Sequence, residues 1–519
     1  MYKEIFGAMY FIISIVAFAF ALINRVHMFQ LNAYKYVFHA EWIKNNIKKL
    51  SLTALLPLAS FVISFVPNDF SAIFASILVV FFLLANLPKK AKKPLVFTAR
   101  VKRLIFTAFI IYALFCVATF ILAKSGLFVY LFALPLIFPS YVMLFANILN
   151  KPVENLVRRK YINEAKKKIS MLPNLTVIGI TGSYGKTGTK YILEKLLSEK
   201  YNVLMTPASY NTTMGVVKVI RENLTPAHEI FICEMGARSV GEIKEICDIV
   251  KPKYGIITSI GPCHLETFGS IENIIKTKFE LCDALPDNGI IFLNADNKYI
   301  AEKNDITKKA VYYGLESEKA DFSAKVLSLS ENGTNFEVSQ GESPAINLSS
   351  KLLGAHSVTN IVGCVAVAKT LGVENDSLIL GAKRIEGAPH RLSLIKGSGF
   401  VIIDDSFNSN PSGCKAALDV LAGFDGQKII ITPGMIELGE KQDQLNRAFA
   451  RQMTEVCDKI FLVGEKQTKP IYDEITKTSF NKENLLVFER VEDAINTAKI
   501  LNTEKRNIIL IENDLPDNF

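Results

Sequence analysis

The stretch TVIGITGSYGKTGTK, residues 176–190, decides the fold of the second half of this chain. It joins an apolar run to a helical pattern through a loop that contains Gly179, Gly182, Gly185, Lys186 and Thr187. A strand, a glycine-rich loop and a helix N-terminus place backbone N–H groups, a lysine and a hydroxyl where they can bind phosphates and Mg²⁺. The stretch predicts ATP binding, although Ile180 stands where the usual P-loop pattern has glycine. A glycine-rich turn with a purely structural role is the alternative.

Length, charge and cysteine content narrow the class of protein. The chain has 519 residues, enough for three or four domains, and 50% of them are hydrophobic. The formal net charge of +9 could attract nucleic acid or anionic lipid. Because the basic residues cluster beside apolar segments, we predict a membrane lipid as partner and no nucleic acid. The eight cysteines contain no CxxC pair, which favours buried, reduced thiols over disulfides or a zinc site.

Apolar segments fill the first 150 residues. There are five of them, at about 5–24, 51–66, 70–87, 104–122 and 126–149. Most are long enough, or nearly so, to cross a bilayer as helices, although the second and third could form one helical hairpin. Three basic segments (25–50, 88–103 and 151–168) alternate with nearly uncharged loops. The apolar segments predict about five spans, of which the first is not a cleaved signal peptide. The positive-inside rule places the three basic segments in the cytoplasm and the N-terminus outside, and an odd number of spans then leaves residues 151–519 in the cytoplasm.

The segment HMFQLNAYKYVFHAEWIKNN, residues 27–46, is both aromatic and basic and contains the only tryptophan, Trp42. One interpretation is an interfacial amphipathic helix that is anchored by its aromatic side chains. The other is a site for a lipid head group or a substrate, built from His27, Gln30 and Tyr34.

The second half of the chain alternates short β-rich runs with helical patterns, which is typical of a mostly parallel α/β sheet. A charged helical linker over 151–173 precedes a central domain at 174–388 and a C-terminal α/β domain at 389–519. The pattern predicts central strands at 174–180, 229–234, 254–260 and 289–294, a small β insertion at 310–350 and a helix at 354–372. It predicts C-terminal strands near 399–404, 427–432, 459–463 and 507–511.

Three further side chains suggest chemistry near the loop. Glu234 closes an apolar strand, where a carboxylate can hold Mg²⁺ beside Thr187. His264 follows another strand end, and Lys278 lies about one helix further along the chain. Taken singly, such a histidine is usually structural and such a lysine is usually solvated, so their meaning depends on the motifs around them.

The motifs of this half resemble, in order, those of the Mur ligase family. They are TGSYGKT (181–187), YNTTMG (210–215), EMGA (234–237), HLETFGS (264–270), KFE (278–280), GAHSVTN (354–360), HRL (390–392), DDSFNSNP (404–411) and PGMIELGE (433–440). The resemblance covers about residues 174–519 and is most like the type that adds D-alanyl-D-alanine to a UDP-N-acetylmuramoyl-tripeptide. It implies a P-loop ATPase-like central domain and a Rossmann-like C-terminal domain.

The resemblance implies a role for each matching residue. ATP phosphates would contact Gly182, Ser183, Gly185, Lys186, Thr187 and Asn211. The rest of the nucleotide would lie near Asn294, Asn360, Arg391 and Asp405. One Mg²⁺ would bind Thr187 and Glu234, and a second would bind His264 and a carbamylated Lys278, so that Lys186, His264 and Lys278 form the catalytic set. Asn408 and Asn410 would face the incoming amine.

The resemblance also has limits. A membrane region stands where Mur ligases have a domain for the UDP end of the substrate, Ser357 replaces a frequent asparagine, and the sequence ENDLPDNF lacks the expected Lys-Gly-Ser segment. We therefore expect an ATP- and Mg²⁺-dependent amide ligase of peptidoglycan precursor synthesis in a bacterial-type cell membrane. Its substrates would be a muramoyl-peptide and a dipeptide such as D-Ala-D-Ala. One alternative is the same chemistry on a lipid-linked acceptor. Two others are an ATP-driven transporter, which the absence of an LSGGQ-like signature disfavours, and a catalytically inactive scaffold.

Overall fold

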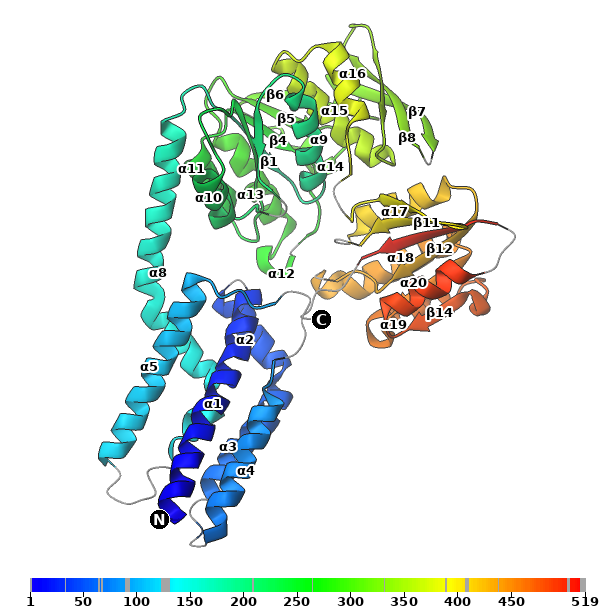
Figure 1. The fold of residues 1–519 in the computed structure, drawn as a ribbon. Helices are drawn as coiled ribbons and strands as arrows, with labels where there is room; N and C mark the ends of the chain where they lie inside the picture. Colours follow the sequence, from blue (N-terminus) through cyan, green and yellow to red (C-terminus); the bar gives the residue numbers. More distant parts are fainter. Residues whose placement is uncertain are drawn as a thin grey trace. The chain divides into compact units, whose positions relative to one another are not determined.

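The computed structural model describes residues 2–513 except 33, 64–65, 67–68, 89–93, 123–130, 208–209, 264, 331, 388–389, 407–409, 437 and 502–504. The described residues form two compact units, one that ends at Arg159 and one that begins at Lys160. The first unit is helical, and the second contains two β-sheets (Figure 1). The predicted division into a helical N-terminal part and an α/β second half is confirmed.

The N-terminal unit is built from apolar helices. They are α1 (Tyr2–Leu31), α2 (Tyr36–Asn45), α3 (Ile47–Ile63), α4 (Asp69–Ala85), α5 (Ala99–Leu122), α7 (Leu134–Ile137) and the first part of α8 (Pro139–Ser170). Helices α1, α3 and α4 lie side by side (Figure 1). Their core contains large apolar side chains such as Phe18 and Phe82, and a hydrogen bond of 3.0 Å joins Tyr10 Oη to Ser60 Oγ inside it.

The prediction of five membrane spans is wrong. Within the described residues, the segments Gly7–Leu31 and Ala99–Ile121 are long and apolar enough to cross a membrane. The helices Tyr36–Asn45 and Ile47–Ile63 meet at 78° and add a third span if the bent pair counts as one. The apolar part of α4, Ile73–Ala85, is shorter than the roughly 20 residues that a bilayer core requires. The external N-terminus, which was inferred from the positive-inside rule, stays a prediction, and so does the cytoplasmic side of residues 151–519, which was inferred from an odd number of spans.

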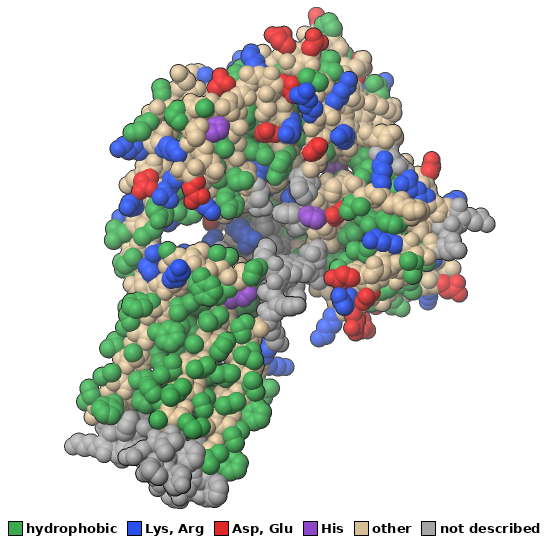
Figure 2. All heavy atoms as spheres, in the orientation of Figure 1, with side chains coloured by type: hydrophobic (Ala, Val, Ile, Leu, Met, Phe, Trp, Pro, Cys, Tyr) green, Lys and Arg blue, Asp and Glu red, His purple; other side chains and the backbone are tan. Residues whose placement is uncertain are grey.

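The surface of the N-terminal unit is itself apolar. Hydrophobic side chains cover these helices in Figure 2 with few charges among them. Many large ones are exposed, including Ile12 and Val16 on α1, Leu55 on α3, Phe81 on α4 and Phe120 on α5. Apolar surface of this extent is unusual on a protein that is surrounded by water, and it marks contact with a membrane or with another protein.

The larger sheet of the second unit has nine strands in the order β2-β3-β1-β4-β5-β6-β7-β8-β9. These are β1 (Thr176–Thr181), β2 (Val203–Met205), β3 (Ile230–Glu234), β4 (Tyr254–Ile257), β5 (Ile290–Asn294), β6 (Lys309–Gly314), β7 (Phe322–Ser330), β8 (Gly333–Gln340) and β9 (Ile346–Ser350). The strands from β2 to β7 pair in parallel, and β8 and β9 pair antiparallel. The segment predicted as a separate insertion at 310–350 therefore extends the main sheet.

Helices cover both faces of this sheet. Successive side chains of a strand point to opposite faces, and apolar side chains of β1 and β3 are buried on each of them. Ile178 of β1 and Ile232 of β3 share a core with α9 (Lys186–Ser198), α15 (Ala355–Thr370) and α16 (Asn375–Lys383). Val177 and Phe231, on the opposite face, share a second core with α10 (Thr213–Glu222), α11 (Glu242–Val250) and α13 (Ile271–Asp283). The C-terminal part of α8 packs into this second core through Ala165.

The second sheet has six strands in the order β10-β11-β15-β12-β13-β14. They are β10 (Ser393–Lys396), β11 (Phe400–Asp405), β12 (Gln427–Thr432), β13 (Lys459–Val463), β14 (Leu485–Phe488) and β15 (Asn507–Glu512), and all pairs except β10–β11 are parallel. Its helices are α17 (Pro411–Ala422), α18 (Gln442–Val456), α19 (Glu465–Ile475) and α20 (Val491–Ile500). The arrangement agrees with the predicted Rossmann-like domain.

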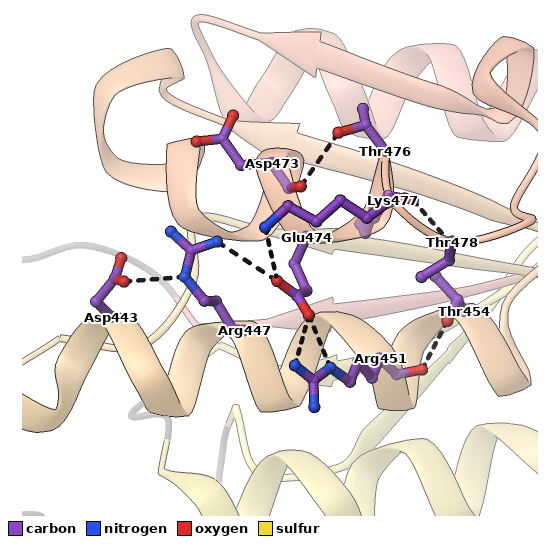
Figure 3. A network of polar contacts seen from close by, with 10 residues as sticks. Asp443, Arg447, Arg451, Thr454, Asp473, Glu474, Thr476, Lys477 and Thr478 are labelled. Carbon is purple, nitrogen blue, oxygen red and sulfur yellow. Dashed lines mark hydrogen bonds and ion pairs between the residues drawn. The ribbon is translucent and has the colours of Figure 1, made fainter.

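An ion network joins α18 to α19 in this domain (Figure 3). The Glu474 carboxylate accepts hydrogen bonds from Arg451 at 2.8 Å, and from Arg447 and Lys477 at 3.4 Å each. Arg447 also donates to Asp443 at 2.9 Å. The hydrogen bond from Arg451, with the neighbouring cations, holds the pKa of Glu474 below its usual range despite partial burial. The network fixes two surface helices to each other.

Candidate active site

The predicted phosphate loop leads from the end of β1 into α9. Gly185 precedes the helix with φ at 81°, a backbone conformation that glycine adopts without strain. A Cβ atom at this position would also lie 3.1 Å from Asn360 Oδ1. A larger residue at position 185 would therefore be opposed by the backbone conformation and by close contact with the Asn360 side chain. The structure brings Asn360, which the motif order assigned to the nucleotide, against the loop.

Hydrogen bonds tie the loop to the segment that follows β4. The Ser183 N–H donates to Ser259 O at 2.7 Å, and the Ser183 hydroxyl donates to Gly261 O at 3.0 Å. The Tyr184 hydroxyl donates to Pro262 O at 3.0 Å. These bonds hold the TGSYGKT motif against residues 259–262, the segment that directly precedes the HLETFGS motif in the sequence.

Lys186 folds back over the loop. Its Nζ donates to Gly182 O at 2.6 Å and to Ser183 O at 3.1 Å. Burial lowers the pKa of Lys186, and the nearby carboxylate of Glu234 partly opposes this shift. A lysine held over a glycine-rich loop at a helix N-terminus is suited to binding phosphate oxygens.

Glu234 is the centre of the polar contacts in this site. It ends β3, and strand pairing places it opposite Ile180 of β1. Its Oε1 accepts hydrogen bonds from the Thr187 hydroxyl at 3.1 Å and from Asn211 Nδ2 at 3.0 Å. Its Oε2 accepts from Lys190 Nζ at 2.8 Å, and both side chains of this ion pair are buried, with exposed fractions of 1% and 0%.

The charge state of Glu234 follows from these neighbours. Burial alone would raise its pKa, but the charge and hydrogen bond of Lys190, the charge of Lys186 and the amide of Asn211 together lower it below the usual value. An ionised carboxylate and a hydroxyl that lie 3.1 Å apart supply the hard oxygen ligands that Mg²⁺ prefers. Thr187 and Glu234 therefore fit the metal that the sequence assigned to them.

Lys278 lies on α13, almost fully buried. Burial, together with the charge of Lys186, lowers the pKa of Lys278 to about 7. Its ammonium lies 5.9 Å from the Phe268 ring centroid. A lysine in this state has an uncharged amine in a large fraction of molecules at neutral pH, and an uncharged amine can act as a nucleophile. His264 lies outside the described residues, as does Asn408.

The remaining predicted nucleotide residues lie at strand ends. Asn294 ends β5, where its amide donates to Thr258 O at 2.9 Å and its oxygen accepts from Asp296 N at 3.0 Å. Asp405 ends β11 and accepts from Leu392 N at 3.2 Å. Burial raises the pKa of Asp405 to about 6, although the charge of Arg391 opposes the shift.

Arg391 and Asn410 occupy different surroundings. Burial lowers the pKa of Arg391, while the carboxylates of Asp405 and Glu234 act in the opposite direction. The structure thus places the HRL motif within electrostatic reach of both carboxylates. Asn410 caps α17 by accepting from Gly413 N at 2.9 Å, a structural role that the sequence reasoning did not foresee. The assignment of Asn410 to the amine substrate stays a prediction.

Sequence reasoning missed Lys190 and Glu512. Lys190 follows Lys186 by one helical turn and so lies on the same face of α9. That spacing could have indicated a role for Lys190 beside the loop, but the sequence does not show that Glu234 is its buried partner. Glu512 ends β15, pairs in register with Asp405, is fully buried and accepts from Cys414 Sγ at 3.2 Å. Two carboxyl groups, those of Asp405 and Glu512, therefore lie side by side at the C-terminal ends of the adjacent strands β11 and β15.

Comparison with known families matches most of the second unit. The sequence profile of the Mur ligase middle domain matches residues 180–368, and that of the Mur ligase glutamate ligase domain matches residues 390–512. The two matched ranges contain every residue that the family resemblance assigned to the nucleotide, to Mg²⁺ or to the amine.

Relatives and solved structures point the same way. The chain is 30% identical over 270 residues to the UDP-N-acetylmuramoyl-tripeptide–D-alanyl-D-alanine ligase of Escherichia coli, which covers 51% of this chain and 59% of that enzyme. It is 28% identical to the Bacillus subtilis enzyme of the same name, over 65% and 72% of the two chains. A crystal structure of MurF from Acinetobacter baumannii aligns with a TM-score of 0.63 at 26% identity, over 69% and 77% of the chains. The chain thus spans little more than half the length of the Escherichia coli relative.

The buried pair predicts a measurable change in stability. Lys190→Met leaves the Glu234 carboxylate buried without its cation, so the free energy of unfolding should fall by about 3–5 kcal/mol. Unfolding in urea, followed by far-ultraviolet circular dichroism, measures the loss. The double variant Lys190→Met with Glu234→Gln removes both charges and should recover part of it. Lys195→Met, a change at a partly exposed position on the same helix, should have little effect; an equal loss in this control would contradict the assignment.

Proposed function

The chain belongs to the Mur ligase family, and on this premise we propose that it is an ATP- and Mg²⁺-dependent ligase that joins a carboxylate to an amine. The proposed reaction is the one that the Escherichia coli and Bacillus subtilis relatives are named for, the addition of D-Ala-D-Ala to UDP-N-acetylmuramoyl-tripeptide in peptidoglycan precursor synthesis. The observation that carries the proposal is the convergence of Lys186, Thr187, Asn211 and Glu234 at the end of β1 and β3.

The reaction has two steps that these residues can support. A carboxylate oxygen of the acceptor bonds to the γ-phosphorus of ATP, and ADP leaves. The amine then attacks the acyl carbon, loses a proton and displaces inorganic phosphate. The first step brings two anions together, so it requires positive charge around the phosphates. Lys186 supplies part of that charge, and the loop N–H groups orient the phosphates. Mg²⁺ held by Thr187 and Glu234 would supply the rest of the positive charge.

The second metal site is the finer part of the proposal. In the Mur ligase pattern, His264 and a carbamylated Lys278 hold a second Mg²⁺. The lowered pKa of Lys278 supports this assignment, because the uncharged amine attacks CO₂, loses a proton and becomes a carbamate anion. Carbamylation replaces a cation that would repel a metal with oxygen ligands that attract it. Arg391 and Asp405 would contact the nucleotide, and Asn408 and Asn410 the amine.

We further propose that the N-terminal unit anchors the ligase to a cell membrane, with the catalytic domains on the cytoplasmic side where ATP is present. The two long apolar segments and the exposed hydrophobic side chains support the anchor. This unit also favours a second candidate function, in which the same chemistry acts on a lipid-linked muramoyl-peptide. Membrane lipid would then be a partner in the reaction as well as the surroundings of the anchor.

Phosphate release by the detergent-purified protein tests the reaction. With ATP and Mg²⁺, release should require both D-Ala-D-Ala and an acceptor, and the soluble UDP-tripeptide and its lipid-linked form should be compared. Lys186→Ala should lower turnover by about 10²–10³-fold or more without unfolding the protein, and Lys195→Ala, at a partly exposed position on the same helix, should not lower it. Release that needs neither substrate, or that survives Lys186→Ala, would contradict the ligase assignment. Activity with the lipid-linked acceptor alone would favour the second candidate.

Chemical rescue tests Lys278. Lys278→Ala should be inactive because the second metal loses a ligand, and formate or acetate should restore part of the activity by replacing the carbamate. Lys276→Ala, an exposed change on the same helix, should keep full activity. Because carbamylation needs the uncharged amine, wild-type activity in CO₂-depleted buffer should be regained when dissolved CO₂ is restored. At equal concentrations of dissolved CO₂, it should return faster above pH 7 than below it. Inactivity of Lys278→Ala without any rescue would remove the support for a carbamate.

Extraction of membranes tests the anchor. The full chain should remain in the membrane pellet through a sodium carbonate wash, which releases peripheral proteins, and should be solubilised by detergent. Release by carbonate alone would show that the apolar helices do not enter the bilayer.

A further inference from the structure

Arg25 is a buried cation in the apolar N-terminal unit. It lies near the end of the segment Gly7–Leu31, and 9% of its surface is exposed. Its Nε is buried without a hydrogen-bond partner among the described residues. The guanidinium lies over the Trp42 ring, 5.8 Å from the ring centroid, in a cation–π contact.

His39 adds a second polar group to the same place. It is fully buried, and its ring stacks on Trp42 with centroids 5.3 Å apart. Its Nδ1 lies 3.4 Å from Asn32 Nδ2, and its Nε2 has no hydrogen-bond partner in the described part of the chain. Two buried polar nitrogens that lack partners therefore flank one tryptophan.

Arg100 extends this cluster. Its guanidinium lies 3.9 Å from the Tyr34 ring centroid, and its Nε is also buried with no hydrogen-bond partner within the described residues. Tyr34 packs edge-on to Phe29 at 5.5 Å, and Phe29 packs in the same way on His39 at 5.1 Å. Ring contacts thus link the Arg100 end of the cluster to the Trp42 end.

Both arginines lie at the same end of the apolar segments. Gln30, one residue before the end of α1, exchanges two hydrogen bonds with the backbone of Val96 just before α5, at 2.9 and 3.0 Å. Arg25 lies in the last two turns of the first apolar segment and Arg100 in the first turn of the second. In a membrane-anchored unit this end lies at the level of the lipid head groups.

The described carboxylates of this unit balance only part of this charge, because the one that acts on Arg100, Glu154, also binds Arg103. Among the described side chains of this unit, Glu41 is exposed, and Glu154 binds Arg103 with both oxygens at 2.8 and 3.0 Å. Burying a guanidinium that has no anion costs more free energy than contact with an aromatic face returns. Among the described residues, Arg25 therefore has no carboxylate partner, and Arg100 shares the single carboxylate of Glu154 with Arg103.

We propose that Arg25, Arg100 and the aromatic side chains between them form a binding site for the phosphate group of a membrane lipid. Guanidinium groups bind phosphate through paired N–H donors, and tryptophan and tyrosine favour the head-group level of a bilayer. The proposal rests on the proposed membrane anchor and is independent of the ligase reaction. A soluble phosphate anion would offer the same chemistry, so the test separates the two sources.

Trp42 reports on the site directly, because it is the single tryptophan of the chain. The full chain in an uncharged detergent is titrated with short-chain phosphatidic acid, with the matching diacylglycerol, and with inorganic phosphate or pyrophosphate. Phosphatidic acid should change Trp42 emission saturably, and diacylglycerol should not. Arg25→Met and Arg100→Met should each weaken the apparent affinity by at least about tenfold. Lys102→Met, an exposed change on α5, should stay within about twofold of the wild type.

The outcomes are distinct. A response to free phosphate equal to that to the lipid would overturn the lipid assignment, and so would a missing saturable response or equal weakening in Lys102→Met. Arg25→Lys keeps the charge without the planar fork and should bind between wild type and Arg25→Met. If Arg25→Met fails to fold, Arg100→Met, at a half-buried position, still decides. Carbonate extraction of the same variants separates loss of lipid binding from loss of the anchor.

Discussion

A buried carboxylate that must stay ionised constrains the whole catalytic region. Glu234 can carry charge inside the protein because Lys190 lies 2.8 Å away, and removal of either charge would leave the other unpaired. The remaining oxygen then orients Thr187 and Asn211, which come from different elements. The pairing of β1 with β3, the start of α9 and the loop before α10 are thus fixed with respect to one carboxylate. The phosphate loop is held in place by the fold itself.

Most of the second unit could be predicted from the sequence, because strand and helix periodicity is local. The strands around the phosphate loop lie where the apolar runs predicted them. Short strands such as β2, β10 and β14 were missed because three or four residues carry little periodic signal. Lys190 was missed because its partner lies 44 residues away and is brought close by strand pairing. The span count failed because apolar composition gives neither the length of a helix nor the positions of its breaks.

Two buried clusters of this molecule hold charge in different ways. In the second unit, the buried Lys190 is paired with the buried carboxylate of Glu234. In the N-terminal unit, Arg25 and Arg100 are surrounded by aromatic rings and have buried nitrogens without hydrogen bonds among the described residues. A fold seldom retains an unbalanced charge in an apolar region unless something outside the chain completes it. The contrast locates where the structure depends on its surroundings.

The eight cysteines all lie within the described part of the chain, where they form no disulfide bonds, and six of them are buried. Cys116 and Cys263 are the two that remain partly exposed. Cys263 directly follows Pro262, whose carbonyl accepts from Tyr184 of the phosphate loop. A thiol-reactive dye applied to the native protein would therefore reach these two positions first. With Cys116 replaced by alanine, the chain would carry a single optical label beside its proposed nucleotide site without further engineering.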